Sequence, residues 1–141
     1  TYPGFLQINE DYGITKSANL SSYYAGICFL QLGNYENAID YLENFKTDDL
    51  LIGSAKFASL GDAYVELGDL DRAVKSYQKG IDDYTNDFST PILLKKAGLA
   101  YEEMEEYEKA IETYEQIRSE FPDATEARDI EKYIARARQN T

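Results

Sequence analysis

The side chains of this chain that could do chemistry are mostly carboxylates, and several of them come in adjacent pairs. Two carboxylates at one place can act as general acid and base, or they can hold a hard cation such as Ca²⁺. Adjacent residues of a helix point about 100° apart, however, so the members of such a pair do not converge on one atom. We therefore interpret these pairs as solvated helix faces. They are Asp48-Asp49, Asp82-Asp83, Glu102-Glu103 and Glu105-Glu106.

Few other residues are candidates for a catalytic or metal-binding site. The acidic segment from Asp82 to Asp87 is the best metal candidate, but it lacks the alternating spacing and terminal Glu of a calcium loop. The chain has no histidine, the commonest general base and metal ligand. Its single cysteine, Cys28, has no basic neighbour to activate the thiol, so we expect a small buried filler. The sequence predicts no catalytic residue, no metal site and no cofactor, and we expect no enzyme.

Composition narrows the class of partner. The 141 residues include 14 basic and 26 acidic side chains, a net charge of −12. This balance argues against nucleic acid and against anionic lipid surfaces, because both are bound by clustered Lys and Arg. No stretch reaches the roughly 20 apolar residues that cross a membrane, so we expect no direct membrane insertion by this segment. The length fits a single domain spanning residues 1–141.

Self-similarity shows what elements must position these side chains. A glycine, an alanine twelve residues later and a large apolar residue four after that recur three times, 35 and 37 residues apart. Small residues on two antiparallel helices let the backbones approach closely, and the larger residue fills the layer beneath. The sequence therefore predicts three helical hairpins. Their repeated positions are Gly26, Ala38 and Leu42, then Gly61, Ala73 and Tyr77, then Gly98, Ala110 and Tyr114.

The hairpin turns carry capping signals. Gly33-Asn34 and Gly68-Asp69 each combine a C-cap glycine with an N-cap side chain for the next helix. The third copy has Glu105-Glu106 instead, so we expect a less tightly specified turn there. Thr90-Pro91 predicts the start of the fifth helix, with threonine as the N-cap. The predicted helices cover residues 17–32, 35–46, 50–67, 70–84, 91–105 and 107–120.

Both ends of the chain align with parts of the repeat. Phe5–Gly13 matches Tyr114–Pro122, and the same offset places Gly26 on Ala135. A final helix is predicted from the capping box that begins at Asp123 to about Gln139. We thus expect three full repeats flanked by half repeats, and we expect natural sequence upstream of residue 1. The segments are a half repeat at 1–16, repeats at about 17–49, 50–88 and 89–122, and a capping helix at 123–141.

These residues resemble the tetratricopeptide repeat, a hairpin of about 34 residues with small residues at its eighth and twentieth positions. The aromatic of the eleventh position is present as Phe29, Tyr64 and Tyr101. The resemblance implies an all-α fold, a right-handed α-solenoid of antiparallel helical hairpins. It also implies a protein-protein interaction scaffold, whose first helices line a concave groove that holds a peptide or protein segment.

A narrower resemblance concerns the amino-acid sequences of three segments, Tyr23–Cys28, Gly61–Asp71 and Glu131–Arg138. These segments look like those of bacterial membrane-anchored tetratricopeptide proteins, similar to an accessory protein of the Sec translocon. That resemblance implies a chaperone-like accessory role and an extracytoplasmic, periplasmic location, with a tether in an N-terminal segment that this sequence does not contain. A cytoplasmic location stays open.

The family's groove positions can be carried onto this chain. Its clamp for a C-terminal carboxylate needs Lys and Asn at the fifth and ninth positions, but the first repeat has Tyr23 and Ile27 there. We therefore expect a groove for an apolar segment, with a small basic end at Lys95, Lys132 and Arg136. The candidate groove residues are Leu20, Tyr23, Ile27, Leu30, Ala58, Asp62, Val65, Ile92, Lys95, Leu99, Lys132 and Arg136.

A second function class stays open beside the peptide-binding scaffold. The chain could be a structural or oligomerisation module with no groove of its own, pairing through open repeat ends as a homo-oligomer. In that case an N-terminal helix or another subunit covers the surface around Tyr23.

Overall fold

The computed structural model describes the backbone of residues 4–141 and the side chains from residue 16 onward. The described residues form helices and no strand, so the predicted all-α fold is confirmed. The chain divides into two compact units, Thr1–Lys46 and Thr47–Thr141, which are treated separately below. The helices are α1 (Gly4–Gln31), α2 (Tyr35–Asn44), α3 (Leu50–Glu66), α4 (Leu70–Asp83), α5 (Thr90–Glu103), α6 (Tyr107–Glu120), the 3₁₀ helix η1 (Thr125–Ala127) and α7 (Ile130–Arg138).

The first unit is the hairpin of α1 and α2. Gly26 is buried between them, and a Cβ atom added to it would lie 2.6 Å from Cγ of Leu42, so only glycine fits. The segment after α2 is tied back to α1 by a pair of hydrogen bonds. The Asn19 amide donates to the carbonyl oxygen of Lys46 at 2.7 Å, and Lys46 N–H donates to Asn19 Oδ1 at 2.8 Å.

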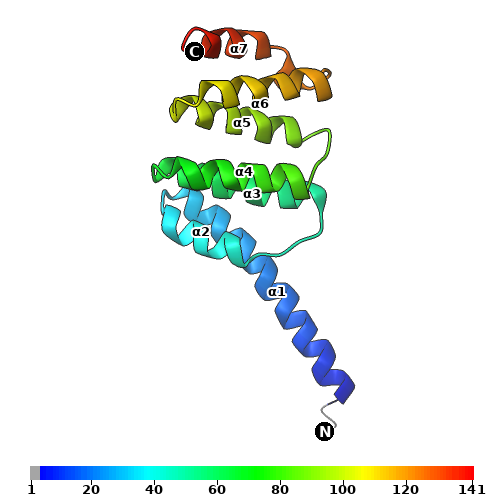
Figure 1. Ribbon diagram of the computed structural model, residues 1–141. Coiled ribbons are helices and arrows are strands. Elements are labelled where there is room, and N and C mark those ends of the chain that lie inside the picture. The colour runs from blue at the N-terminus through cyan, green and yellow to red at the C-terminus, as the bar shows by residue number, and fades with distance from the viewer. Residues whose placement is uncertain (1–3) are drawn as a thin grey trace. The chain divides into compact units, whose positions relative to one another are not determined.

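The second unit stacks two hairpins and a closing helix (Figure 1). Helices α3 and α4 pair, as do α5 and α6, while α4 packs on α5 and α6 on α7. The atoms nearest to a Cβ added at Gly61 belong to the ring of Tyr77, one turn beyond Ala73 on α4. Gly98 meets Tyr114 in the same way. The glycines thus make room for a large side chain on the partner helix.

The three hairpin turns share one backbone conformation. Gly33 and Gly68 have φ of 79°, and Glu105 has φ of 61°. Each turn is closed by the same backbone hydrogen bond; in the third, Glu106 N–H donates to the carbonyl oxygen of Tyr101 at 2.9 Å. The expectation of a looser third turn is therefore wrong. The packing of α5 against α6 holds Glu105 in a conformation that costs an L-residue about 1–2 kcal/mol.

Replacing Glu105 with glycine should raise the free energy of unfolding by about 0.5–1 kcal/mol. Glycine removes the cost of the left-handed backbone, and part of that gain is offset by the larger entropy of the unfolded chain. The midpoint of urea unfolding would report the change. Glu103→Gly serves as the control: Glu103 lies in the last turn of α5, so glycine there should lower the midpoint. A lower midpoint for Glu105→Gly would contradict the strain argument.

The N-terminal helix differs from its predicted bounds. We predicted that this helix begins at residue 17, yet α1 begins at Gly4 and continues through Gly13. A single glycine costs a helix only about 1 kcal/mol, and no proline stands at Gly13 to stop it. The half repeat assigned to residues 1–16 stays a prediction, because the side chains before residue 16 lie outside the described part.

The start of the last helix also differs. We predicted a capping box at Asp123, but the chain first forms η1, whose N-terminus has no side-chain cap, and α7 begins only at Ile130. Backbone hydrogen bonds between residues three apart stabilise the 3₁₀ turn instead. In one of them Ala127 N–H donates to the carbonyl oxygen of Ala124 at 3.0 Å. Helix α7 packs on α6 with Ile130, Ile134 and Ala137 at most 1% exposed, and its capping role stays a prediction.

Two further expectations concern single residues. Cys28 is exposed rather than buried, although Ala63 and Ala100, its equivalents in the next two repeats, are buried. Thr90 does not cap α5 but is its first residue, and its Oγ1 accepts a hydrogen bond from Asn86 N–H at 2.8 Å. No helix in the described range is both long and apolar enough to cross a membrane.

Candidate functional site

An apolar pocket lies between α3 and α5 in the second unit. Its volume is about 220 Å³, and its lining is almost entirely carbon. Two predicted groove residues, Ala58 and Ile92, line it, and Phe88 forms part of its rim with 73% of its surface exposed. An exposed phenylalanine at the edge of an apolar hollow is typical of a binding surface. The lining residues are Leu51, Ser54, Ala55, Ala58, Phe88, Ser89, Ile92 and Leu93.

The turn that carries Phe88 is held by Asn86. Asn86 Oδ1 accepts hydrogen bonds from the backbone N–H groups of Phe88 at 3.0 Å and Ser89 at 2.7 Å, an Asx turn. Its amide nitrogen donates to the carbonyl oxygen of Tyr84 at 2.9 Å and to Ser89 Oγ at 2.6 Å. Sequence reasoning missed this network, because residues 84–89 lie between repeats where no periodicity applies. The Asn86-x-Phe88-Ser89 spacing was the available signal.

A second hollow, of about 190 Å³, lies between the same two helices. Three predicted groove residues, Asp62, Val65 and Leu99, line it. Asp62 accepts a hydrogen bond from Tyr77 Oη at 2.6 Å, and its two oxygens accept from Lys96 Nζ at 3.0 and 3.1 Å. Burial, together with the Asp62 carboxylate, raises the pKa of the Tyr77 phenol far above its ordinary value.

The same three-part arrangement recurs one repeat later. Glu102 accepts a hydrogen bond from Tyr114 Oη at 2.8 Å and two from the Arg136 guanidinium, both at 2.9 Å. In the first set the cation is Lys96 on α5, and in the second it is Arg136 on α7. Each cation follows its carboxylate by 34 residues in the sequence. Arg136 therefore forms a structural ion pair with Glu102, and hydrogen bonding to Glu102 raises the pKa of the Arg136 guanidinium above its ordinary value. We call these two sets the inter-repeat networks.

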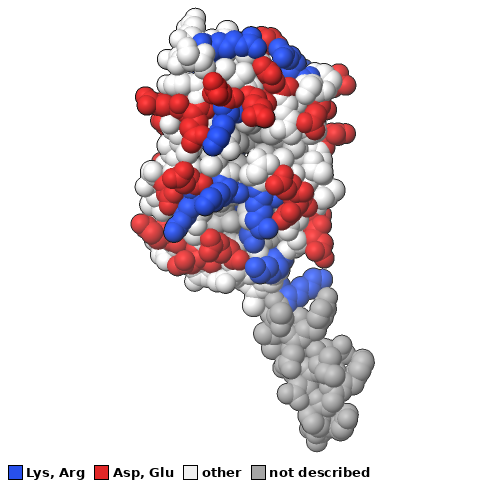
Figure 2. Space-filling model, viewed as in Figure 1, with Lys and Arg blue, Asp and Glu red and all other residues white. Residues whose placement is uncertain are grey.

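Three cations surround one aromatic ring between α5 and α7. Lys95 Nζ lies 4.6 Å from the centroid of Tyr133, Lys132 Nζ 5.6 Å and Arg136 Cζ 4.8 Å. The structure thus brings the predicted basic end together, around a tyrosine that sequence reasoning had not assigned to it. Among the described carboxylates none pairs with Lys95 or Lys132, whereas Arg136 is neutralised by Glu102. Figure 2 shows Lys and Arg side chains over α7, with Asp and Glu along both flanks of the second unit.

The four predicted groove residues of α1 belong to the first unit. Leu20 is exposed, while Tyr23, Ile27 and Leu30 are half-buried. The ring centroid of Tyr23 lies 4.8 Å from that of Phe45, so this side chain partly packs within its own hairpin. Burial raises the pKa of the Tyr23 phenol, with Tyr24 adding to the effect. A single groove that includes these residues together with α3 and α5 stays a prediction.

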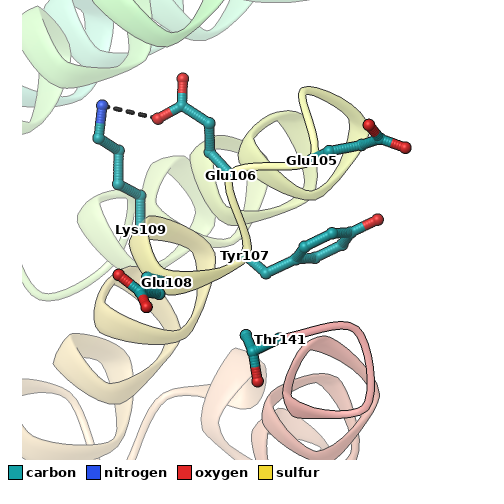
Figure 3. Close-up of a pocket in the computed structure, with 6 residues that line it drawn as sticks. All are labelled: Glu105, Glu106, Tyr107, Glu108, Lys109 and Thr141. Carbon is teal, nitrogen blue, oxygen red and sulfur yellow. Dashed lines mark ion pairs between the residues drawn. The ribbon is translucent and has the colours of Figure 1, made fainter.

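A third hollow, of about 370 Å³, surrounds the turn between α5 and α6 and the C-terminal Thr141. Figure 3 shows that the carboxylates of Glu105, Glu106 and Glu108 point in different directions, and that Glu106 pairs with Lys109 at 2.7 Å. No group of three potential metal ligands occurs in the described part of the chain.

Comparison with known proteins gives a family and a fold. The family model for the soluble NSF attachment protein, SNAP, matches residues 30–126, more than half of the chain. The TPR repeat-containing protein MJ1428 of Methanocaldococcus jannaschii is 27% identical over 124 residues, which cover 84% of this chain and 22% of that protein. The chain thus spans about a fifth of the length of this curated relative.

Solved structures resemble the chain at low sequence identity. The TPR2B-domain:pHsp70-complex of yeast Sti1 matches with a TM-score of 0.72 and 18% identity, over 89% of this chain and 99% of that one. The first TPR of Spaghetti (RPAP3), bound to the HSP90 peptide SRMEEVD, matches with a TM-score of 0.66 and 17% identity, over 87% and 92%. These likenesses confirm the helical-hairpin solenoid predicted from the repeats.

Proposed function

Because the chain belongs to the soluble NSF attachment protein family and has a tetratricopeptide-type fold, we propose that it is a protein-interaction scaffold without catalytic activity. Its ligand in this proposal is an apolar segment of a partner protein that carries an acidic flank. The observation that carries the proposal is the apolar pocket between α3 and α5, rimmed by the exposed Phe88.

The size of the pocket supports a side chain as its occupant. Pockets for drug-sized molecules measure roughly 300–1,000 Å³, whereas this one measures about 220 Å³. It is suited to one large apolar side chain inserted between Ala58 and Ile92. Because the small alanines at 55 and 58 leave the space open and Phe88 extends its wall, a leucine, methionine or phenylalanine side chain would bury most of its surface there.

Positive charge between α5 and α7 supports the acidic flank. Lys95 lies one turn beyond Ile92 on α5, and together with Lys132 it forms positive charge in a chain of net charge −12. In this proposal a carboxylate further along the bound segment, toward α7, meets these ammonium groups. Among the similar structures, the peptide bound to Spaghetti, SRMEEVD, combines a methionine with acidic residues, and yeast Sti1 is bound to pHsp70.

A phage-displayed library of random dodecapeptides, selected on the immobilised chain, would test the proposal. We expect enrichment of peptides that combine a large apolar residue with Asp or Glu elsewhere in the same peptide. Fluorescence titration of an enriched peptide should weaken at least tenfold with Phe88→Ser, about 1.4 kcal/mol. Because Phe88 is largely exposed, this variant should fold normally. Lys95→Glu should weaken binding mainly at low salt.

Two further variants make the test specific. Leu67→Ser removes an exposed leucine outside the pocket and should bind the peptide as the wild type does. Tyr23→Ala/Ile27→Asp asks whether α1 contributes to the same surface. Selection without enrichment, or equal affinity for Phe88→Ser and the wild type, would leave the alternative of a structural module with no groove of its own.

A finer part of the proposal concerns the setting of the scaffold. We propose that it works outside the cytoplasmic membrane, as part of a tethered, chaperone-like accessory protein. The support is the resemblance of Tyr23–Cys28 and Glu131–Arg138 to bacterial membrane-anchored proteins. Protease added to intact spheroplasts of the source cells should digest the native protein. Protection until the cells are lysed would place it in the cytoplasm instead.

A further inference from the structure

The apolar pocket and the second hollow follow one another along the surface between α3 and α5. Ala58 lines the pocket, and Val65, seven residues later on α3, lines the hollow. Ile92 and Leu99 have the same spacing and the same order on α5. Seven residues are about two turns of a helix, a rise of roughly 10.5 Å. The two helices therefore offer two binding positions separated by two helical turns.

The walls of the second hollow suit an aliphatic chain. Val65, Leu99 and Ala100 line it, and Leu99 is 40% exposed. The charges of Asp62 and Lys96 neutralise each other, because their ion pair measures 3.0 Å. The methylene groups of a long side chain can therefore be buried here, and a charged end group can stay at the rim.

The rim of the second hollow favours a positive charge. Glu103 lines the hollow, is exposed and forms no ion pair with any residue that the structure describes. It is also the last residue of α5, and Val65 is the last but one of α3. Two helices thus end at this hollow, and the C-terminal end of a helix attracts cations. A carboxylate and two helix ends together make this position suited to a cation.

We propose that the bound segment is a helix that inserts a large apolar residue into the apolar pocket and a lysine or arginine, seven residues away, into the second hollow. This inference rests on the proposed function, because it specifies the segment that the same surface binds. A helix presents residues seven apart on one face at the required rise of two turns. A β-strand spaces the residues of one face by about 6.6 or 13 Å and does not match.

Two helical peptides of equal composition and net charge would test the inference. Each has twenty residues, mostly alanine and glutamine, with one leucine near its centre. The first carries an arginine seven residues to either side of the leucine, so it covers both directions of binding. The second carries each arginine five residues away, which turns it about 140° around the helix. By fluorescence anisotropy the first should bind about fivefold more tightly, and circular dichroism should show equal helicity.

Variants of the chain assign this preference to the second hollow. Glu103→Lys reverses the exposed charge at the rim and should abolish the preference for the first peptide. Glu112→Lys is the matched control, since it changes the net charge equally at an exposed residue of α6 that lines neither the pocket nor the hollow. This control should keep the preference. Phe88→Ser should weaken both peptides, because each presents its leucine to the apolar pocket.

Failure of this inference differs from failure of the proposed function. Equal affinity of the two peptides for the wild type would overturn the inference, and so would a preference that persists in Glu103→Lys. If Phe88→Ser still weakened both peptides, the proposed function would stand. Peptides that bind Phe88→Ser as tightly as the wild type would refute the proposed function, and this inference with it. Absence of binding by either peptide would overturn this inference alone, because the phage selection tests the proposed function independently.

Discussion

Replacing Gly61 with alanine should destabilise the protein by about 1–3 kcal/mol, although alanine is the better helix former by about 1 kcal/mol. A Cβ atom at this position would overlap the ring of Tyr77. The ring cannot move away freely, because its hydroxyl donates to Asp62 and its side chain is only 2% exposed. Leucine, which adds three more carbons, should cost more than alanine.

Thermal and urea unfolding of a double-mutant cycle would isolate this contact. Tyr77→Leu opens space above Gly61, so alanine at residue 61 should cost much less in that background than in the wild type. Gly98→Ala, which meets Tyr114, should behave as Gly61→Ala does. Stabilisation by Gly61→Ala, as helix propensity alone predicts, would sink the packing argument.

Deleting the chain after Pro122 should unfold or aggregate the α5–α6 hairpin. Helix α7 packs on α6, in which Ala110, Tyr114 and Ile117 are each 0% exposed, and the ring centroid of its Tyr133 lies 5.7 Å from that of Tyr114. Its own Ile134 is also fully buried, and truncating such a residue to alanine costs about 2–5 kcal/mol. Losing the whole helix also removes Arg136 from Glu102, so apolar and polar contacts are lost together.

Point variants distinguish the effect of lost packing from the effect of a shorter chain. Ile134→Ala should lower the melting temperature substantially, whereas Arg138→Ala should change it little, because that arginine forms only a surface ion pair with Glu115. Size-exclusion chromatography would show whether the deleted chain aggregates. A deletion variant that is monomeric and melts at the wild-type temperature would refute the capping role of α7.

The repeat register could be predicted because volume constrains it. Gly26, Gly61 and Gly98 each oppose a large side chain on the partner helix, and this requirement leaves a fixed spacing in the sequence. Helix ends were less predictable. The turn at Glu105 adopts the glycine conformation without a glycine, since packing on both sides overrides the local preference. Near Asp123 the capping box is present in the sequence, but the apolar stripe that fixes α7 starts only at Ile130.

The candidate site was predictable only in part, for a related reason. Ala58, Asp62, Ile92 and Leu99 repeat with the helices, so their shared surface followed from the repeat. Phe88 lies between repeats, where its exposure depends on the hydrogen bonds of a single asparagine. The burial of Cys28 could not be predicted from its equivalents in the other repeats, because burial depends on whether a neighbouring helix covers the position.

The inter-repeat networks have a consequence for how the second unit comes apart. In a solenoid the total stability is approximately a sum of the stabilities of single repeats and of their nearest-neighbour coupling. Lys96 from α5 reaches Asp62 of the preceding hairpin, and Arg136 from α7 reaches Glu102 in the same way. In each network a buried tyrosine of the second helix joins the link. Melting of one repeat therefore removes partners from the repeat before it, which raises the cooperativity of unfolding from α3 to α7.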